Sequence, residues 1–390
     1  MQDRWTLLDT ENRIYQEAVS RHGDSFSPAL EGREGASELG FRWTRLAGGL
    51  SDGVDLLEVD NGPWTVYILP TRGMSVWRIQ GDMSLGWRSP VRGPVNPAFV
   101  PLMDPGGLGW LEGFDELLVR CGLESNGPPL FDAQGRLAAP LHGRIGNRPA
   151  HFVGVRFDAA TDEIVIDGLV SETRFLIRDL VLHVEYRLPI GERRMKVRDR
   201  VANRSGRPAE MQMLYHVNVG SPILAEGARL HVPTVQAAPR DSRAAENTQG
   251  WATYAGPEAG YAEQVYFFEL ASDAESVTEA LLASPGGERG FGLAWDREEL
   301  PCFAQWKNTA SLDEGYVTGL EPGTNFPNPK PYERERGRVR TLAPGESVAF
   351  ELELREYVSR EEVDEAAARI LNLTPGDPLV HAEPLRDWSI

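Results

Sequence analysis

The segment Leu180-Val-Leu-His-Val-Glu-Tyr-Arg187 (LVLHVEYR) alternates apolar and polar side chains with the two-residue period of a half-buried β-strand. Residues 54–59, 64–69 and 163–167 alternate or run apolar over similar lengths, and Gly, Pro, Asn and Asp separate these runs. Many short strands with few helices indicate a sandwich or barrel rather than βαβ units. The sequence therefore predicts an all-β fold.

Two segments at the edges of the strand-rich region have the pattern of short helices. Residues 9–21 begin with a suitable N-cap, and residues 360–371 follow Ser359, with Glu362 completing a capping box. No repeat of fixed period and no linker-like tract divides the region between them. We therefore expect an N-terminal helical extension over residues 1–29, one β domain over 30–358, and a C-terminal helix and tail over 359–390.

The amino-acid composition excludes two classes of binding partner. The 390 residues include 58 acidic and 40 basic side chains, a formal net charge of −18. Such a chain is unsuited to nucleic acid, which needs clustered Lys and Arg, and to an anionic membrane surface. Two cysteines are too few for a disulfide scaffold, and neither a signal peptide nor an apolar run of membrane-spanning length is visible. We expect a cytoplasmic protein, with a homodimer among its possible assemblies, that acts on a small molecule.

Two histidines and one glutamate lie in three segments that are far apart in the chain. His and Glu suit acid–base catalysis near neutral pH, because their surroundings can bring either pKa close to the working value. Strand alternation places His216 and Asn218 on one face and Tyr215 on the other. A buried histidine satisfied by core neighbours is the alternative interpretation. The three segments are Pro140–Arg144 (PLHGR), Leu214–Asn218 (LYHVN) and Gly319–Gly323 (GLEPG).

The surroundings of His142 and Glu321 also suit a ligand site. His142 precedes a glycine that permits close approach, and Arg144 adds a guanidinium fork. Glu321 ends a strand-like run and opens into a loop rich in Pro and Asn that includes Asn325. Buried among aromatic side chains, this carboxyl would have a raised pKa and could act as a base near neutrality. On the surface it would be an ordinary acidic side chain, and His142 would be a turn residue.

Further polar candidates surround a tryptophan. Trp306 lies between Gln305 and Lys307, a combination that resembles a carbohydrate platform, where the ring stacks on the sugar and the polar groups bond its hydroxyls. A core tryptophan with an extended lysine is the alternative. Arg72 is another candidate ligand for hydroxyls, or else a structurally paired charge. No H-x-x-x-H or C-x-x-C spacing occurs, so we expect no metal site.

Six motifs together give the chain a family resemblance. Over about residues 40–355 it is similar to the aldose 1-epimerase (galactose mutarotase) superfamily, and it most resembles the divergent branch catalogued as a domain of unknown function. The motifs are PTRGM (70–74), GWRSP (86–90), RCGL (120–123), PLHGR (140–144), APRD (238–241) and LEPGTN (320–325).

The resemblance implies a β-supersandwich, two large antiparallel sheets with a cleft on one concave face. It further implies that His142 binds the sugar, that His216 is the general acid and that Glu321 is the general base. We therefore expect anomers of a free sugar to be interconverted without a cofactor. The other expected sugar ligands are Arg72, Arg144, Asn218, Gln305, Trp306, Lys307 and Asn325. A carbohydrate-binding protein without turnover, and an isomerase, epimerase or lyase of a modified sugar, are the alternatives.

Overall fold

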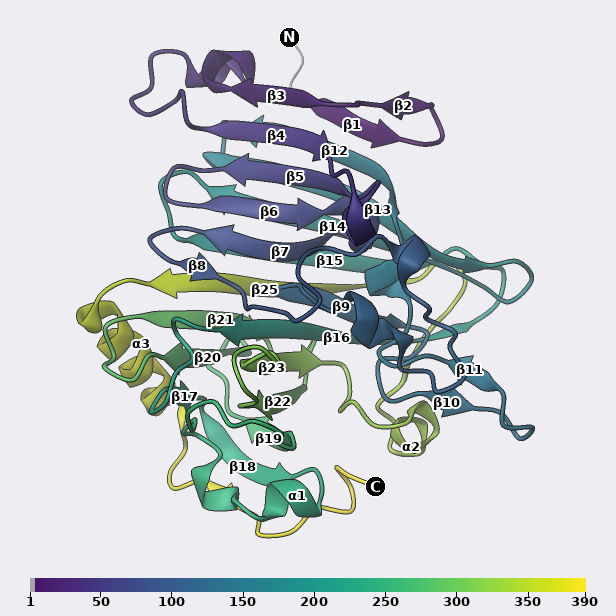
Figure 1. The fold of residues 1–390 in the computed structure, drawn as a ribbon, viewed down its shortest axis with the longest axis vertical. Coiled ribbons are helices and arrows are strands. Elements are labelled where there is room, and N and C mark those ends of the chain that lie inside the picture. Colours follow the sequence, from purple (N-terminus) through teal and green to yellow (C-terminus); the bar gives the residue numbers. More distant parts are fainter. Residues whose placement is uncertain (1–3) are drawn as a thin grey trace.

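The computed structural model describes residues 4–390, which form two large, mainly antiparallel sheets packed face to face (Figure 1). One sheet has fourteen strands and the other has ten, and a separate pair of short strands completes the β structure. The predicted all-β sandwich is confirmed. The segment 180–187 lies within one long strand, where Leu180, Leu182, Val184 and Tyr186 are buried as the alternation requires.

The fourteen-stranded sheet brings together strands from distant parts of the chain. Strand β8 (Ser84–Leu85) pairs with β7, and β24 (Arg340–Leu342) pairs with β16. The main path runs in the order β26 (Leu379–Val380), β18 (Thr234–Pro239), β19 (Gln264–Leu270), β22 (Cys302–Asn308), β23 (Val317–Gly323), β16 (Ala209–Gly220), β9 (Leu118–Leu123), β7 (Ser75–Gln80), β6 (Thr65–Leu69), β5 (Asp55–Asp60), β4 (Gly40–Arg45) and β3 (Val19–His22).

The ten-stranded sheet lies behind it in the view of Figure 1. Its order is β17 (Arg229–His231), β20 (Val277–Ala283), β21 (Gly290–Asp296), β25 (Ser347–Tyr357), β15 (Arg194–Asn203), β14 (Arg178–Pro189), β13 (Glu163–Arg174), β12 (Ala150–Asp158), β1 (Trp5–Asp9) and β2 (Ile14–Tyr15). The separate pair is β10 (Leu130–Phe131) and β11 (Leu137–Ala139), and the α-helices are α1 (Ser242–Ala245), α2 (Lys330–Glu335) and α3 (Arg360–Leu373).

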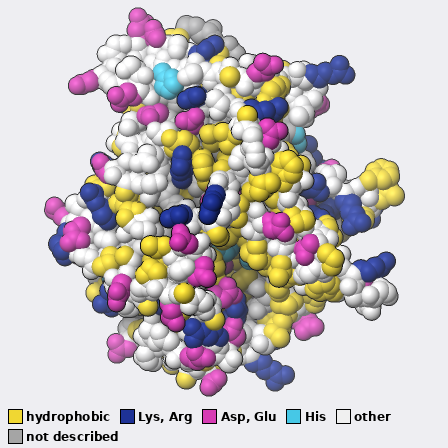
Figure 2. Space-filling model, viewed as in Figure 1, with side chains coloured by type: hydrophobic (Ala, Val, Ile, Leu, Met, Phe, Trp, Pro, Cys, Tyr) yellow, Lys and Arg dark blue, Asp and Glu magenta, His cyan; other side chains and the backbone are white. Residues whose placement is uncertain are grey.

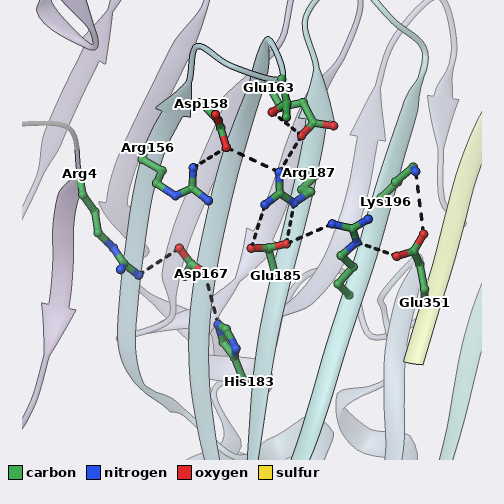
Figure 3. A network of polar contacts seen from close by, with 12 residues as sticks. Arg4, Arg156, Asp158, Glu163, Asp167, His183, Glu185, Arg187, Lys196 and Glu351 are labelled. Atoms are coloured by element: carbon green, nitrogen blue, oxygen red, sulfur yellow. Dashed lines mark hydrogen bonds and ion pairs between the residues drawn. The ribbon is translucent and has the colours of Figure 1, made fainter. Parts of the chain in front are cut away.

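The outer face of the ten-stranded sheet carries charged side chains that pair within one strand and between neighbouring strands (Figure 3). Arg187 on β14 contacts Glu163 at 2.8 Å and Glu185 at 2.6 Å, and His183 lies 3.3 Å from Asp167. These side chains are only partly exposed, and their charges mark the polar face of a two-faced sheet. The apolar faces of both sheets therefore point inward.

A buried ion pair connects the two sheets inside the hydrophobic core. Arg120 on β9 contacts Asp199 on β15, and both side chains are fully buried. Tyr215 donates its hydroxyl to Asp199 at 2.7 Å, and Arg120 donates to the hydroxyl of Tyr186 at 3.0 Å. Tyr215 therefore points between the sheets, the face opposite to the neighbouring His216, as alternation predicts.

The helix predicted over residues 9–21 is wrong, because this segment forms strands β1 to β3. Asp9 accepts hydrogen bonds from the backbone and side chain of Asn12 at 3.0 and 2.8 Å, which makes a turn instead of a helix start. β1 then pairs with β12, and β3 pairs with β4. A short isolated helix is marginal, so pairing with existing sheet edges overrides weak local propensity. The N-terminal segment is thus part of the sandwich.

The predicted C-terminal helix is confirmed and extends to Leu373. Ser359 accepts from the backbone N–H of Glu362 at 3.2 Å, while the Glu362 side chain accepts from the N–H of Val358 instead of Ser359. Val363, Ala366 and Ile370 form its buried face, as an amphipathic helix requires. No helix within residues 4–390 is long and apolar enough to cross a membrane.

Candidate active site

Strands β16 and β23 place His216 and Glu321 side by side on the outer face of the fourteen-stranded sheet. The register pairs Asn218 with Gly319, so the residues two positions away from this pair also become neighbours. His216 Nε2 lies 3.2 Å from Glu321 Oε1, and both side chains are about 95% buried. Gly319 leaves the space for this contact, because a Cβ there would meet Glu321 Oε1 at 2.6 Å and His216 Cε1 at 3.0 Å.

Asn218 fixes the orientation and the tautomer of His216. The Nδ2 group of Asn218 donates to the carbonyls of Glu116 at 2.9 Å and of His216 at 3.1 Å, so its Oδ1 is the atom that faces the imidazole. His216 Nδ1 lies 2.6 Å from this oxygen and therefore carries the proton. The lone pair of a neutral His216 is consequently on Nε2, the atom that faces Glu321.

Burial sets the protonation states of the two groups. It raises the pKa of the Glu321 carboxyl to about 8, and the charge of Glu263 adds to the rise while that of Arg240 opposes it. It lowers the pKa of His216 to about 3, and the nearby His142 lowers it further. At neutral pH the pair therefore holds one proton between Glu321 Oε1 and His216 Nε2. It can give one proton and take another, which is the requirement for coupled acid–base chemistry.

Aromatic rings enclose the imidazole of His216 and make its surroundings apolar. The ring centroids of Phe114, Trp306 and Trp110 lie 5.2, 5.5 and 6.1 Å from it, and that of His142 lies 5.4 Å away. His142 and Trp306 are partly exposed, whereas Phe114 and Trp110 are buried. A ligand would therefore reach the His216–Glu321 pair past His142 and Trp306.

An acidic and a basic side chain border the other edge of Trp306. Its Nε1 donates to Glu263 at 2.6 Å, and Arg240 contacts the second oxygen of Glu263 at 3.1 Å. The charges of both groups act on Glu321, so they lie close to its carboxyl. The motif at residues 238–241 contains Arg240 without indicating this role, and nothing in the local sequence marks Glu263. Only the pairing of β18, β19 and β22 brings them here.

Five of the sequence-predicted site residues lie together: His142, His216, Asn218, Trp306 and Glu321. The irregular segment between β8 and β9 exposes three apolar side chains, those of Met103, Leu108 and Leu111. Figure 2 shows hydrophobic side chains gathered right of the centre of this face. Within residues 4–390, no group of three or more His, Cys, Asp and Glu side chains is arranged to hold a metal ion.

Arg72, expected to bind sugar hydroxyls, lies in the interior instead. It is fully buried and contacts Glu116 at 2.5 Å. Its remaining donors bond the carbonyl of Val95, the side chain of Asn147 and the carbonyl of Gly113, at 2.7–3.1 Å. Burying a guanidinium demands such complete pairing. Arg72 therefore supports the segment around Glu116, whose carbonyl in turn anchors the amide that orients His216.

Gln305 and Lys307, expected beside Trp306, point to the opposite face of β22. Gln305 donates to the hydroxyl of Tyr254 at 2.8 Å, and Lys307 donates to three backbone carbonyls in residues 250–253. The physical reason is strand alternation, which separates a residue from both of its neighbours. These side chains are buried in the interior behind the strand and do not lie beside the Trp306 ring.

Asn325 and Arg144 make other contacts and do not join the acid–base pair. Asn325 exchanges two amide hydrogen bonds of 2.9 Å with Asn126, whose carbonyl oxygen lies 2.9 Å from His142 Nδ1. Asn325 therefore supports the loop that positions His142. Arg144 donates to the sulfur of Met103 at 3.0 Å, at the edge of the exposed apolar segment.

Comparison with known proteins identifies the family of the chain. Residues 51–355 match a family model described as a domain of unknown function, DUF4432. A search of curated proteins finds no match. The fold closely matches the crystal structure of a "putative aldose 1-epimerase" from Klebsiella pneumoniae, with 34% identity, a TM-score of 0.91 and coverage of 97% of this chain and 98% of that one.

More distant structures share the fold alone. A galactose mutarotase-like protein from Clostridium acetobutylicum is 16% identical, with a TM-score of 0.56 over 82% of this chain and 99% of that one. A second "putative aldose 1-epimerase", from Escherichia coli K12, is 15% identical, with a TM-score of 0.51 over 78% and 100%. The chain therefore belongs to the DUF4432 family, a divergent branch of the aldose 1-epimerase-like proteins with the galactose mutarotase-like fold.

Proposed function

We propose that this protein interconverts the anomers of a free sugar, with His216 and Glu321 as its acid–base pair. The observation that carries the proposal is the 3.2 Å contact between Glu321 Oε1 and His216 Nε2 in a site walled by aromatic rings, where burial raises the pKa of the carboxyl and lowers that of the imidazole. The family relationship to aldose 1-epimerase-like proteins supports the same chemistry.

Opening a cyclic hemiacetal requires a proton at the ring oxygen and the loss of one from the anomeric hydroxyl. In the proposed reaction the sugar enters between the two groups, and the shared proton passes to His216, which donates it to the ring oxygen. Glu321 removes the proton from the anomeric hydroxyl. The carbonyl group then rotates, and reclosure reverses both transfers. Each positioned acid or base contributes about 10²–10⁴-fold, and proton transfer alone completes the cycle.

The partly exposed rings define how the sugar would be held. Trp306 offers an apolar surface to the C–H face of a pyranose, and its Nε1 is occupied by Glu263. The imidazole of His142 is roughly perpendicular to that of His216, with the ring centroids 5.4 Å apart, and its Nδ1 contacts the backbone carbonyl of Asn126. Its Nε2 is thus the atom available to a sugar hydroxyl.

The test is anomer exchange measured by NMR on a panel of free neutral and acidic monosaccharides. We expect the protein to accelerate exchange of at least one sugar and to leave its composition unchanged. Formation of a new compound would assign the protein to the isomerases, epimerases or lyases of modified sugars. Saturable binding of a sugar with no accelerated exchange would make it a binding protein and reject the proposal.

A further inference from the structure

A cavity of about 570 Å³ lies near the acid–base pair, with Phe114 packed between its lining residue Trp87 and His216. Strand β7 supplies Trp77 and Arg78, and the segment that follows β8 supplies Trp87, Arg88 and Arg92. Asp115 completes its charged lining. The motif GWRSP at residues 86–90 forms part of this wall, and the acid–base chemistry leaves that motif without a role.

The charge of this cavity is opposite to that of the molecule. Three arginines face one carboxyl group here, in a chain whose net charge is −18. Figure 2 shows basic side chains near the middle of this face. Arg88 pairs with Asp313 at 3.1 Å, but both side chains are more than three-quarters exposed, so water screens the pair. The local field therefore favours an anion.

Two of the arginines have no carboxylate partner, and stacking holds one of them, Arg78, in place. The guanidinium of Arg78 lies over the rings of Trp77 and Tyr67, 4.2 and 4.7 Å from their centroids. Within the described residues 4–390, neither Arg78 nor Arg92 forms an ion pair with an acidic side chain. Stacking on aromatic rings fixes the plane of a guanidinium and leaves its N–H groups free for a planar or tetrahedral oxyanion.

Asp115 is the one acidic group in the lining, and its surroundings weaken its charge. Burial raises the pKa of Asp115 to about 7, and the neighbouring Glu116 adds to the rise. Trp77 Nε1 donates to this carboxyl at 3.0 Å. At neutral pH a large fraction of the group is protonated, so it opposes a bound anion only weakly and can donate to it.

The cavity and the acid–base pair are held by two common contacts, the ring of Phe114 and the carbonyl of Glu116. The ring of Phe114 packs 4.9 Å from that of Trp87 and 5.2 Å from that of His216, so a single ring separates the two. The carbonyl of Glu116 accepts hydrogen bonds from both Trp87 Nε1, at 3.2 Å, and Asn218, at 2.9 Å. A ligand that reaches from one site to the other would be a sugar with a charged substituent.

We propose that the arginine cavity binds the oxyanion group, a phosphate or a carboxylate, of an acidic sugar whose ring lies at His216 and Glu321. Arg78 and Arg92 bind the anion, and the indole of Trp87 packs against the part of the sugar nearest to it. The inference rests on the proposed mutarotation for the position of the ring. The anion site itself stands on the arginines, the rings and the cavity.

Calorimetry with glucose 6-phosphate, glucuronate, glucose and inorganic phosphate tests the proposal on the wild-type chain and on an R78Q/R92Q double variant. We expect at least one of the two acidic sugars to bind wild type tenfold or more tightly than glucose does, and tighter than inorganic phosphate. The double variant should lose at least tenfold of this preference. R136Q, which removes a mostly exposed arginine, is the matched control and should keep the preference.

Equal affinities for acidic and neutral sugars, or an unchanged preference in the folded double variant, would overturn the proposal. Inorganic phosphate that binds as tightly as the sugar phosphate would also overturn it, because the site would then hold a free anion. The R78K/R92K variant, which keeps the charge, should restore part of the preference. If acidic sugars bind as expected but no anomer exchange occurs, the anion site stands and the mutarotation fails.

Discussion

Glu321 and His216 are in direct contact, and the pH dependence of the proposed reaction should show whether they act together. The pair shares one proton at pH values between the pKa of His216, about 3, and the pKa of Glu321, about 8. Above pH 8 the raised pKa of Glu321 is passed, the proton is lost and no acid remains. We expect the protein-dependent rate of anomer exchange to be level near neutrality and to fall about tenfold per pH unit well above pH 8. A rate that keeps rising through pH 9 after correction for the uncatalysed reaction would contradict this assignment.

Asn218 positions His216 and can be used to shift its pKa. A carboxylate in place of the amide, 2.6 Å from Nδ1, would stabilise the imidazolium, so Asn218→Asp should raise the pKa of His216 by about 1–3 units. The low-pH limit of activity should move upward by the same amount. The pH–rate profile of the variant checks this, with Asn12→Asp on the exposed turn as the control. An unmoved acid limb would show that Asn218 does not control the imidazole.

The two faces of strand β22 have different roles: we expect the face with Trp306 to bind sugar and the face with Lys307 to stabilise the fold. Trp306→Ala removes an aromatic wall of the site, and we expect at least tenfold weaker sugar binding. Lys307→Met leaves three backbone carbonyls without their donor, so the free energy of unfolding should fall by about 1–3 kcal/mol while sugar binding persists. Calorimetry and urea unfolding of both variants measure the two effects. Loss of sugar binding in a folded Lys307→Met variant would contradict the orientation of the strand.

The same alternation explains what the sequence could and could not predict. It correctly separated Tyr215 from His216, because both lie within one regular strand. Applied to β22, the same rule would also have separated Gln305 and Lys307 from Trp306, so that error was avoidable. The burial of Arg72 was not predictable, since its partners come from two segments, between β8 and β9 and between β11 and β12, that only the fold brings together. The strands within residues 9–21 form because neighbouring sheet edges are available for pairing. Those edges belong to distant parts of the chain, so the local sequence does not predict them.

The two sheets of the whole molecule are joined by polar contacts as well as by the hydrophobic core. Arg120→Met leaves Asp199 buried without its partner, and we expect a loss of about 3–5 kcal/mol in the free energy of unfolding. Tyr215→Phe removes one hydrogen bond to the same carboxylate and should cost less, about 1–2 kcal/mol, with anomer exchange retained.

Urea unfolding compares these variants with Arg33→Met, which breaks the partly exposed pair with Asp162 and should cost under about 1 kcal/mol. Equal losses for Arg120→Met and Arg33→Met would show that the buried contact does not join the sheets.

The fold of the whole molecule brings His216 and Glu321, which are 105 residues apart in the chain, within hydrogen-bonding distance. The most direct test is anomer exchange of the best sugar of the panel by wild type, Glu321→Gln and the exposed control Glu335→Gln. Glutamine keeps the shape of the side chain but cannot exchange the proton, so we expect exchange to fall by about 10²-fold or more while sugar binding and the control remain unaffected. Undiminished exchange by Glu321→Gln would contradict the account.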